Sequence, residues 1–175
     1  MFKVLSCITG QHSIPLVLLA AAVCAFGSFT ALSLLGRARD EETRRVDWRW
    51  LVAASAVAGA AVWSTHFVAM LAYDADALPL GYEVGLTALS IGIAMVVTLA
   101  GFSAYLYWND APMGGAIFGL AIGVMHFTGM AALNVPATFE WETPYVVASL
   151  VIGATFGGLA IKVFAKVGGW RGVLH

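Results

Sequence analysis

The sequence predicts an all-α membrane protein: a bundle of five transmembrane helices with the amino terminus outside and the carboxyl terminus in the cytoplasm. Hydrophobic residues make up 61% of the 175 residues and charged residues only 11%, whereas a soluble domain carries about 25% charged residues. Five apolar segments are long enough to cross a bilayer, which takes about 20 helical residues each. The basic residues fall in alternate connections between these segments.

The five segments are expected at residues 14–35, 50–73, 82–107, 112–135 and 145–164. In lipid every backbone polar group must be paired within the protein, and no segment alternates as a barrel strand does, so these segments must be helices. Pro112 and Pro144 stand at predicted helix starts and Pro136 follows a predicted helix end, as the missing amide of proline favours.

The distribution of charge predicts the orientation. The first connection carries five arginines, and the residues near the carboxyl end include Lys162, Lys166 and Arg171, whereas the second and fourth connections contain acidic residues and no Lys or Arg. The positive-inside rule then places the carboxyl terminus in the cytoplasm. The formal net charge of −1 provides no basic surface for phosphates, so nucleic acid is excluded as a partner.

An internal repeat connects residues 59–72 with residues 119–132, sixty positions later. Both copies contain, in register, a glycine, a His-Phe pair and a methionine four residues after the histidine. A helix without histidine precedes each copy. We therefore expect a single domain over residues 1–175, with repeat one at 12–73, repeat two at 82–135 and a partial third repeat at 145–171 that lacks its histidine-bearing half.

The repeated histidines and methionines predict a metal site. Residues four apart share one face of a helix, so His66 with Met70 and His126 with Met130 each offer two ligand atoms. Imidazole and thioether are soft, neutral donors that suit copper, above all Cu(I). The alternative is that the histidines bond backbone carbonyls while the methionines fill gaps. Recurrence in register favours the metal, with His66, Met70, Met125, His126 and Met130 as candidate ligands and His12 capping the site from outside.

Other patterns predict packing rather than chemistry. Gly115, Gly119 and Gly123 recur every four residues, as do Gly153 and Gly157, and small residues at this spacing let helices approach closely. Catalysis is not expected, because the sequence has no Ser-His-Asp set, no paired interior carboxylates and no phosphate-binding loop.

The stretch Met125-His126-Phe127-Thr128-Gly129-Met130 resembles the signature of the bacterial MHYT sensory domain. Residues 65–70 resemble the looser first copy of that signature, and residues 12–17 and 28–32 are similar to the opening helix of the family. The resemblance implies a multi-pass sensor of the bacterial inner membrane that binds copper through these His and Met residues. It also implies sensing of a diatomic gas (O2, CO or NO) and control of a cytoplasmic output domain or protein.

The chain departs from the family pattern at several points. Phe67 and Phe127 stand where tyrosine is usual, Thr65 replaces a methionine, and the sequence lacks a complete third copy and an output domain. The site is then incomplete or is completed by a homo-oligomer. Two further alternatives are a haem sensor with His66 and His126 as axial ligands and a small copper-handling or transport protein. A structural bundle that binds no metal is the third.

Overall fold

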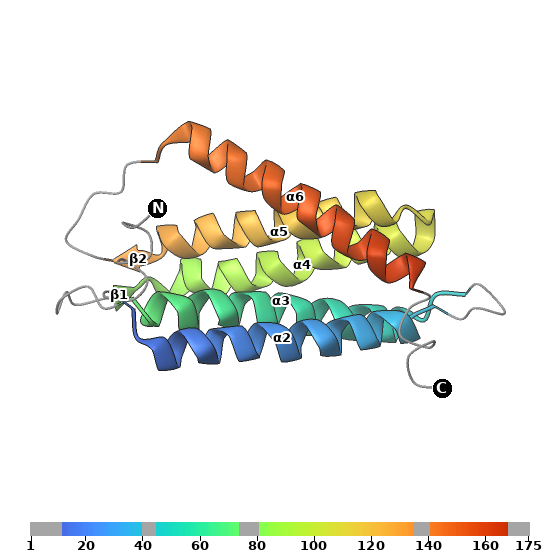
Figure 1. The fold of residues 1–175 in the computed structure, drawn as a ribbon, viewed down its shortest axis with the longest axis horizontal. Helices are drawn as coiled ribbons and strands as arrows, with labels where there is room; N and C mark the ends of the chain where they lie inside the picture. The colour runs from blue at the N-terminus through green and yellow to red at the C-terminus, as the bar shows by residue number, and fades with distance from the viewer. Residues whose placement is uncertain (1–11, 40–44, 74–80, 135–140, 168–175) are drawn as a thin grey trace.

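The computed structural model describes residues 12–39, 45–73, 81–134 and 141–167. Within these ranges lie five helices, each long and apolar enough to cross a membrane, and two short strands, which Figure 1 shows. The elements are α2 (Ile14–Arg37), α3 (Trp48–Leu71), β1 (Gly81–Tyr82), α4 (Val84–Trp108), α5 (Ala111–Ala131), β2 (Leu133–Asn134) and α6 (Thr143–Lys166). The prediction of an all-α, multi-pass membrane protein with five helices is confirmed.

Side-chain caps set the starts of the middle helices. The carboxylate of Asp47 accepts a hydrogen bond from the Arg49 amide (2.9 Å), and that of Asp110 accepts one from the Met113 amide (2.9 Å). Glu83 accepts from the amides of Gly85 and Leu86, and these bonds hold the pKa of its carboxyl below its usual value. Each cap satisfies amides that the first helical turn leaves unpaired.

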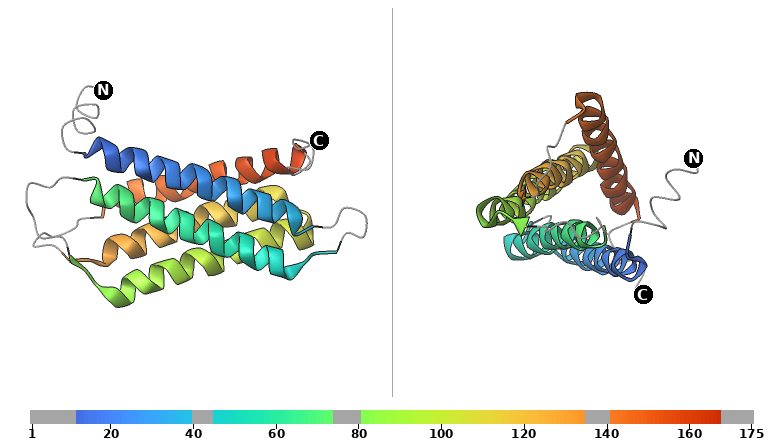
Figure 2. Two further views of the ribbon diagram at one scale, coloured as in Figure 1. Left: turned by 90° about the horizontal axis from the view of Figure 1, so that it is seen from below. Right: turned by 90° about the vertical axis from the view of Figure 1, so that its left-hand side faces the viewer.

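The helices follow one another in space as they do in sequence. α2 packs on α3, α3 on α4, α4 on α5 and α5 on α6, whereas α2 and α6 do not pack closely together. Figures 1 and 2 show that α6 runs obliquely across the others and stands apart from α2 at the end that carries the strands. The bundle is therefore open on the side between its first and last described helices.

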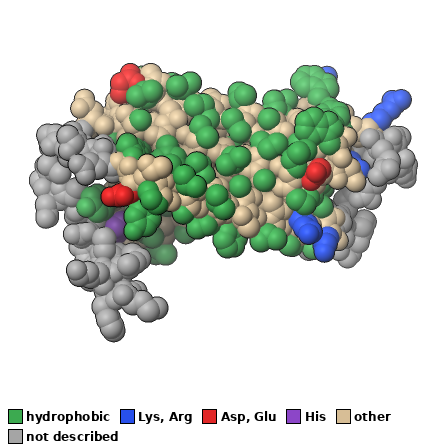
Figure 3. Space-filling view, turned by 90° about the horizontal axis from the view of Figure 1, so that it is seen from above, with side chains coloured by type: hydrophobic (Ala, Val, Ile, Leu, Met, Phe, Trp, Pro, Cys, Tyr) green, Lys and Arg blue, Asp and Glu red, His purple; other side chains and the backbone are tan. Residues whose placement is uncertain are grey.

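The main hydrophobic core lies towards the other end. Leu35 of α2, Phe102 and Tyr105 of α4, and Ile161 and Phe164 of α6 belong to one buried cluster. Many large apolar side chains are also exposed on the outer surface, and Figure 3 shows them on one face of the bundle. A hydrophobic surface of this kind is expected where lipid replaces water.

The end of the bundle near this core is basic. Arg39 donates from Nη1 to Oδ1 of Asn109 (2.9 Å), and the Arg37 guanidinium lies 5.5 Å from the centre of the Trp50 ring. Asn109 has a φ of 56°, the left-handed conformation that turns the chain from α4 into α5. The positive-inside rule predicts that this end is cytoplasmic and the opposite end is outside.

The opposite, outer end is held by short backbone pairings. β1 pairs antiparallel with β2, with Gly81 opposite Asn134 and Tyr82 opposite Leu133, and His12 forms an isolated bridge with Tyr73. The sequence analysis placed Tyr82, Leu133 and Asn134 in helices, and this was wrong. Their amides and carbonyls pair between two connections, which helical periodicity within either segment cannot reveal.

Candidate metal centre

The structure brings the two repeated histidines into direct contact. Nδ1 of His66 on α3 lies 3.3 Å from Nδ1 of His126 on α5. The ring centroids are 4.9 Å apart and the ring planes meet at 81°. The sixty-residue repeat thus places its two histidines at one point between two helices, which the sequence pattern alone could not show.

A glycine allows this approach. A Cβ atom on Gly129 would lie 2.9 Å from Nε2 of His66 and 3.2 Å from its Cδ2. Any side chain at this position would therefore push the His66 ring away from α5. α3 and α5 approach each other over a short stretch only, and this contact is part of it. The sequence analysis did not assign Gly129 a role in the site, because its neighbour is distant in sequence.

Three buried polar side-chain atoms around α3 have no hydrogen-bond partner. They are Nε2 of His66, Oγ1 of Thr65 and the hydroxyl of Tyr82, and within the described ranges they are all the atoms of this kind. Unpaired polar groups are costly in a low-dielectric interior. One of the three atoms belongs to the histidine pair itself, and Thr65 is the residue directly before His66 on α3.

Aromatic rings enclose the His66 side of the site. The Phe67 ring lies 5.1 Å from the His66 ring and 5.3 Å from that of Tyr82, and Trp63 stacks on Phe67 at 4.6 Å. Burial raises the pKa of the Tyr82 phenol. The sequence analysis placed Tyr82 at the start of a predicted helix (residues 82–107) and assigned it no role in the site. Strand pairing through β1 brings it against Phe67.

The other predicted ligands differ in position. Met125 is almost completely buried, at 1% exposure, on the same face of α5 as Gly129. Met70 and Met130 are half-buried, one helical turn beyond each histidine. His12 lies beside Tyr73, with ring centroids 5.4 Å apart, and Tyr73 is about 10 Å further along the α3 direction than His66 at 1.5 Å per residue. The structure therefore brings the two histidines together and places His12 at the outer rim.

The glycine pattern forms the α5–α6 contact, as predicted. A Cβ on Gly115 would overlap the Gly157 backbone, and one on Gly119 would overlap the backbone of Gly153. The two helix backbones therefore touch directly. His126 lies seven residues after Gly119, on nearly the same face of α5 and about 10 Å further along the helix.

The histidine contact permits two kinds of chemistry. One neutral imidazole can donate a hydrogen bond to the other, with the donor set by the tautomers. Alternatively, both Nδ1 atoms can bind one cation, since two nitrogens each about 2.0 Å from a tetrahedral ion lie about 3.3 Å apart. Among the described residues no group of three His, Cys, Asp or Glu side chains surrounds such an ion, so methionine is the remaining predicted ligand type.

Comparison with known proteins identifies the family. The profile "MHYT: Bacterial signalling protein N terminal repeat" matches residues 59–113 and again residues 119–175. The two matches begin at the glycines that open the two copies of the repeat. The chain belongs to the MHYT family. Each matched MHYT unit starts on a histidine-bearing helix and runs into the helix that follows it. No solved structure matches the chain.

Several curated signalling proteins share this MHYT region. An uncharacterized signaling protein of Caulobacter vibrioides is 39% identical over 87% of this chain. The bifunctional diguanylate cyclase/cyclic di-GMP phosphodiesterase MucR and the cyclic di-GMP phosphodiesterase NbdA, both of Pseudomonas aeruginosa, are 33% and 32% identical over 85% and 89% of it. The matched regions make up 19%, 22% and 20% of these three relatives. The chain thus spans about a fifth of their length.

Proposed function

We propose that this chain is the membrane sensory part of a bacterial inner-membrane signalling protein and that it binds one copper ion between His66 and His126. The observation that carries the proposal is the 3.3 Å separation of the two Nδ1 atoms. These atoms belong to equivalent residues of the two repeats and come from two helices that otherwise approach each other little. A shared ion would join the repeats at this point.

The donor set favours copper over the alternatives. Two imidazoles with Met125 or Met130 as a third ligand form a soft, uncharged site, which suits Cu(I). Zinc sites more often include cysteine or carboxylate ligands. The rings touch directly, and this contact leaves no room for the macrocycle of a haem between them. Met70 and His12 are proposed as outer residues that close the site.

Copper would supply a binding position for a diatomic gas such as O2, CO or NO. The protein's own residues would convert occupancy of that position into movement. His66 and His126 fix the distance between α3 and α5, and the glycine seam connects α5 to α6. A change in the histidine separation would therefore shift α6, whose last turn is at the cytoplasmic end.

The cytoplasmic output of the signal is proposed by analogy with the named relatives. MucR and NbdA carry names that assign them cyclic di-GMP turnover, and by analogy the signal from this chain would reach a cytoplasmic domain or protein. Because the named relatives are signalling proteins, they favour a sensor over a copper transporter. Interaction with the bilayer follows from the five apolar helices, and a homo-oligomer stays a prediction.

Elemental analysis of the detergent-purified protein, with an absorption spectrum, tests the proposal. We expect about one copper per chain in the wild type and almost none in the His66→Ala/His126→Ala variant. A His175→Ala variant is the matched control, because that histidine lies outside residues 59–72 and 119–132 and its loss is expected to leave the copper content unchanged. Equal copper in all three proteins, or none in a folded wild type reconstituted with Cu(I), would overturn the proposal. A Soret absorption band would indicate haem instead.

A further inference from the structure

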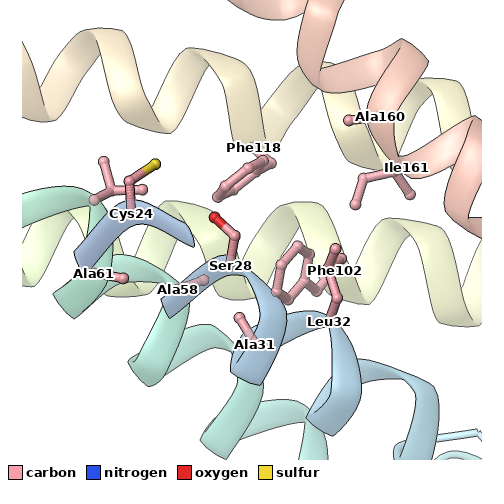
Figure 4. Close-up of a pocket in the computed structure, with 11 residues that line it drawn as sticks. Cys24, Ser28, Ala31, Leu32, Ala58, Ala61, Phe102, Phe118, Ala160 and Ile161 are labelled. Carbon is pink, nitrogen blue, oxygen red and sulfur yellow. The ribbon is translucent and has the colours of Figure 1, made fainter. Parts of the chain in front are cut away.

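A cavity lies inside the bundle on the cytoplasmic side of the histidine pair. Its volume is ≈ 170 Å³ and all five helices contribute to its wall. Figure 4 shows Cys24 and Ser28 of α2 pointing towards Phe118 of α5, with Phe102 of α4 and Ile161 of α6 on the other side. The site described above does not use this space.

The lining predicts an apolar occupant. The Ser28 hydroxyl and the Cys24 thiol are the polar side-chain groups of the wall, and the remaining lining side chains are aliphatic or phenyl groups. A water molecule needs two to four polar partners, and an apolar cavity of about 150 Å³ stays dry and takes up xenon or benzene. The cavity has the size and chemistry of such a site.

The cavity is accessible from the bilayer. Cys24, Ser28 and Ala160 line it and are also exposed, and they belong to α2 and α6, which do not pack closely together. The opening therefore faces hydrocarbon rather than water. Small molecules of low polarity concentrate in hydrocarbon, so the bilayer itself would deliver them.

The cavity adjoins the histidine pair along one face of α3. Ala58 and Val62 line it, and His66 follows Val62 by four residues, so the three residues form one stripe. Val62 and His66 are separated by about one helical turn, a rise of about 6 Å along α3. A molecule in the cavity would be next to the helix face that positions His66.

We propose that this cavity is a binding site for a small uncharged molecule of low polarity, in the class of a dissolved gas, which enters from the bilayer between α2 and α6. It holds the molecule one helical turn from His66. Its link to sensing rests on the proposed function, whereas the binding itself does not require copper.

Methyl NMR under xenon pressure tests the proposal, with xenon as the probe. In the wild type we expect saturable shifts of the Val62 and Ile161 methyl signals. Ala160→Leu adds bulk at the mouth of the cavity and is expected to weaken this response by about tenfold or more, because the larger side chain would occupy the space that xenon needs. Ala148→Leu is the matched control: the same change on the same helix, at an exposed position that does not line the cavity.

Two results would overturn the proposal. Shifts that rise linearly with pressure and are equal in all three proteins would show xenon in the bilayer only. Persistent contacts between the Val62 methyls and a lipid chain that xenon does not displace would show that an acyl chain fills the cavity. The copper-free His66→Ala/His126→Ala variant separates the two proposals, because it is expected to keep the saturable xenon response even though its histidine pair is gone.

Discussion

The decisive contact at the scale of single residues is that between His66 and His126. The sequence predicted both histidines and their methionine neighbours, because the repeat conserves them in register within one chain. It could not predict that the two Nδ1 atoms meet at 3.3 Å or that Gly129 makes room for the His66 ring. These features depend on how α3 and α5 cross, which neither helix encodes alone.

Gly129→Ala is expected to weaken copper binding by about 10- to 100-fold, the effect of disturbing the support of a metal ligand. The added Cβ would be 2.9 Å from His66 Nε2 and would displace the ring. Competition with a Cu(I) chelator measures the change. In the control, Gly92→Ala, the new Cβ meets nothing within 4 Å, so copper affinity is expected to stay at the wild-type value. An unchanged affinity in Gly129→Ala would refute this role for Gly129.

Ser90→Ala is expected to lower the free energy of unfolding by about 1–2 kcal/mol, because it leaves a donor unpaired in the interior. Ser90 is fully buried, and its hydroxyl accepts the indole N–H of Trp63 at 3.0 Å, which ties α4 to α3. Denaturant unfolding in mixed micelles measures the change. A loss below the error of that measurement would mean that the bond contributes nothing to packing.

Two features dominate at the scale of helices: the caps at their starts and the glycine seam between α5 and α6. Spacing of glycines in the sequence predicted the seam, since small residues every four positions mark a helix face. Helix ends were predicted less well near β1 and β2. There the backbone of residues 133–134 pairs with residues 81–82, a contact that is distant in sequence.

Gly119→Ala is expected to destabilise the protein by about 1–3 kcal/mol, the usual cost of overpacking. Its Cβ would overlap the carbonyl oxygen of Gly153, so α5 and α6 would have to separate. The free energy of unfolding measures this effect. Gly92→Ala again serves as the control, since it adds the same methyl group in open space. Equal stability of the two variants would contradict the observed seam.

The start of α4 is expected to respond to acid. Hydrogen bonds from the Leu86 and Gly85 amides lower the pKa of Glu83 from its ordinary value of 4.5. A lowered pKa in the folded protein means that the cap stabilises fully above the ordinary value and that this stabilisation is lost as the pH falls through the folded pKa. When the pH is lowered from about 6 through the folded pKa of Glu83, the melting temperature of Glu83→Gln should therefore fall less than that of the wild type. If the melting temperatures of the two proteins fell equally with pH, the result would argue against a stabilising role for the Glu83 cap.

Two features belong to the whole molecule: the arrangement of charge along the bundle and the open side of the bundle between α2 and α6. The five helices and their order were predictable, because hydropathy is a property of the sequence itself. Their orientation in the membrane stays a prediction from loop charge. The cavity, the oblique course of α6 and the gap between α2 and α6 were not, because they result from helix crossing angles. The distribution of basic residues predicts that Arg45 lies at the cytoplasmic end and Asn134 at the outer end.

Labelling of single cysteines tests this orientation in a Cys7→Ser/Cys24→Ser background. A membrane-impermeant thiol reagent added to cells with a permeable outer membrane is expected to label Asn134→Cys but not Arg45→Cys, which should react only after lysis. Both side chains are exposed, so accessibility within the fold does not limit the reaction. The reverse pattern would invert the orientation.

The central claim is that one copper ion joins the two repeats through His66 and His126. X-ray absorption at the copper edge tests it most directly, because imidazole rings give a characteristic scattering pattern that can be counted. The account predicts two imidazoles at about 2.0 Å from copper in the wild type and one in His126→Ala loaded under the same conditions. Two imidazoles in both proteins, or none in the wild type, would contradict it.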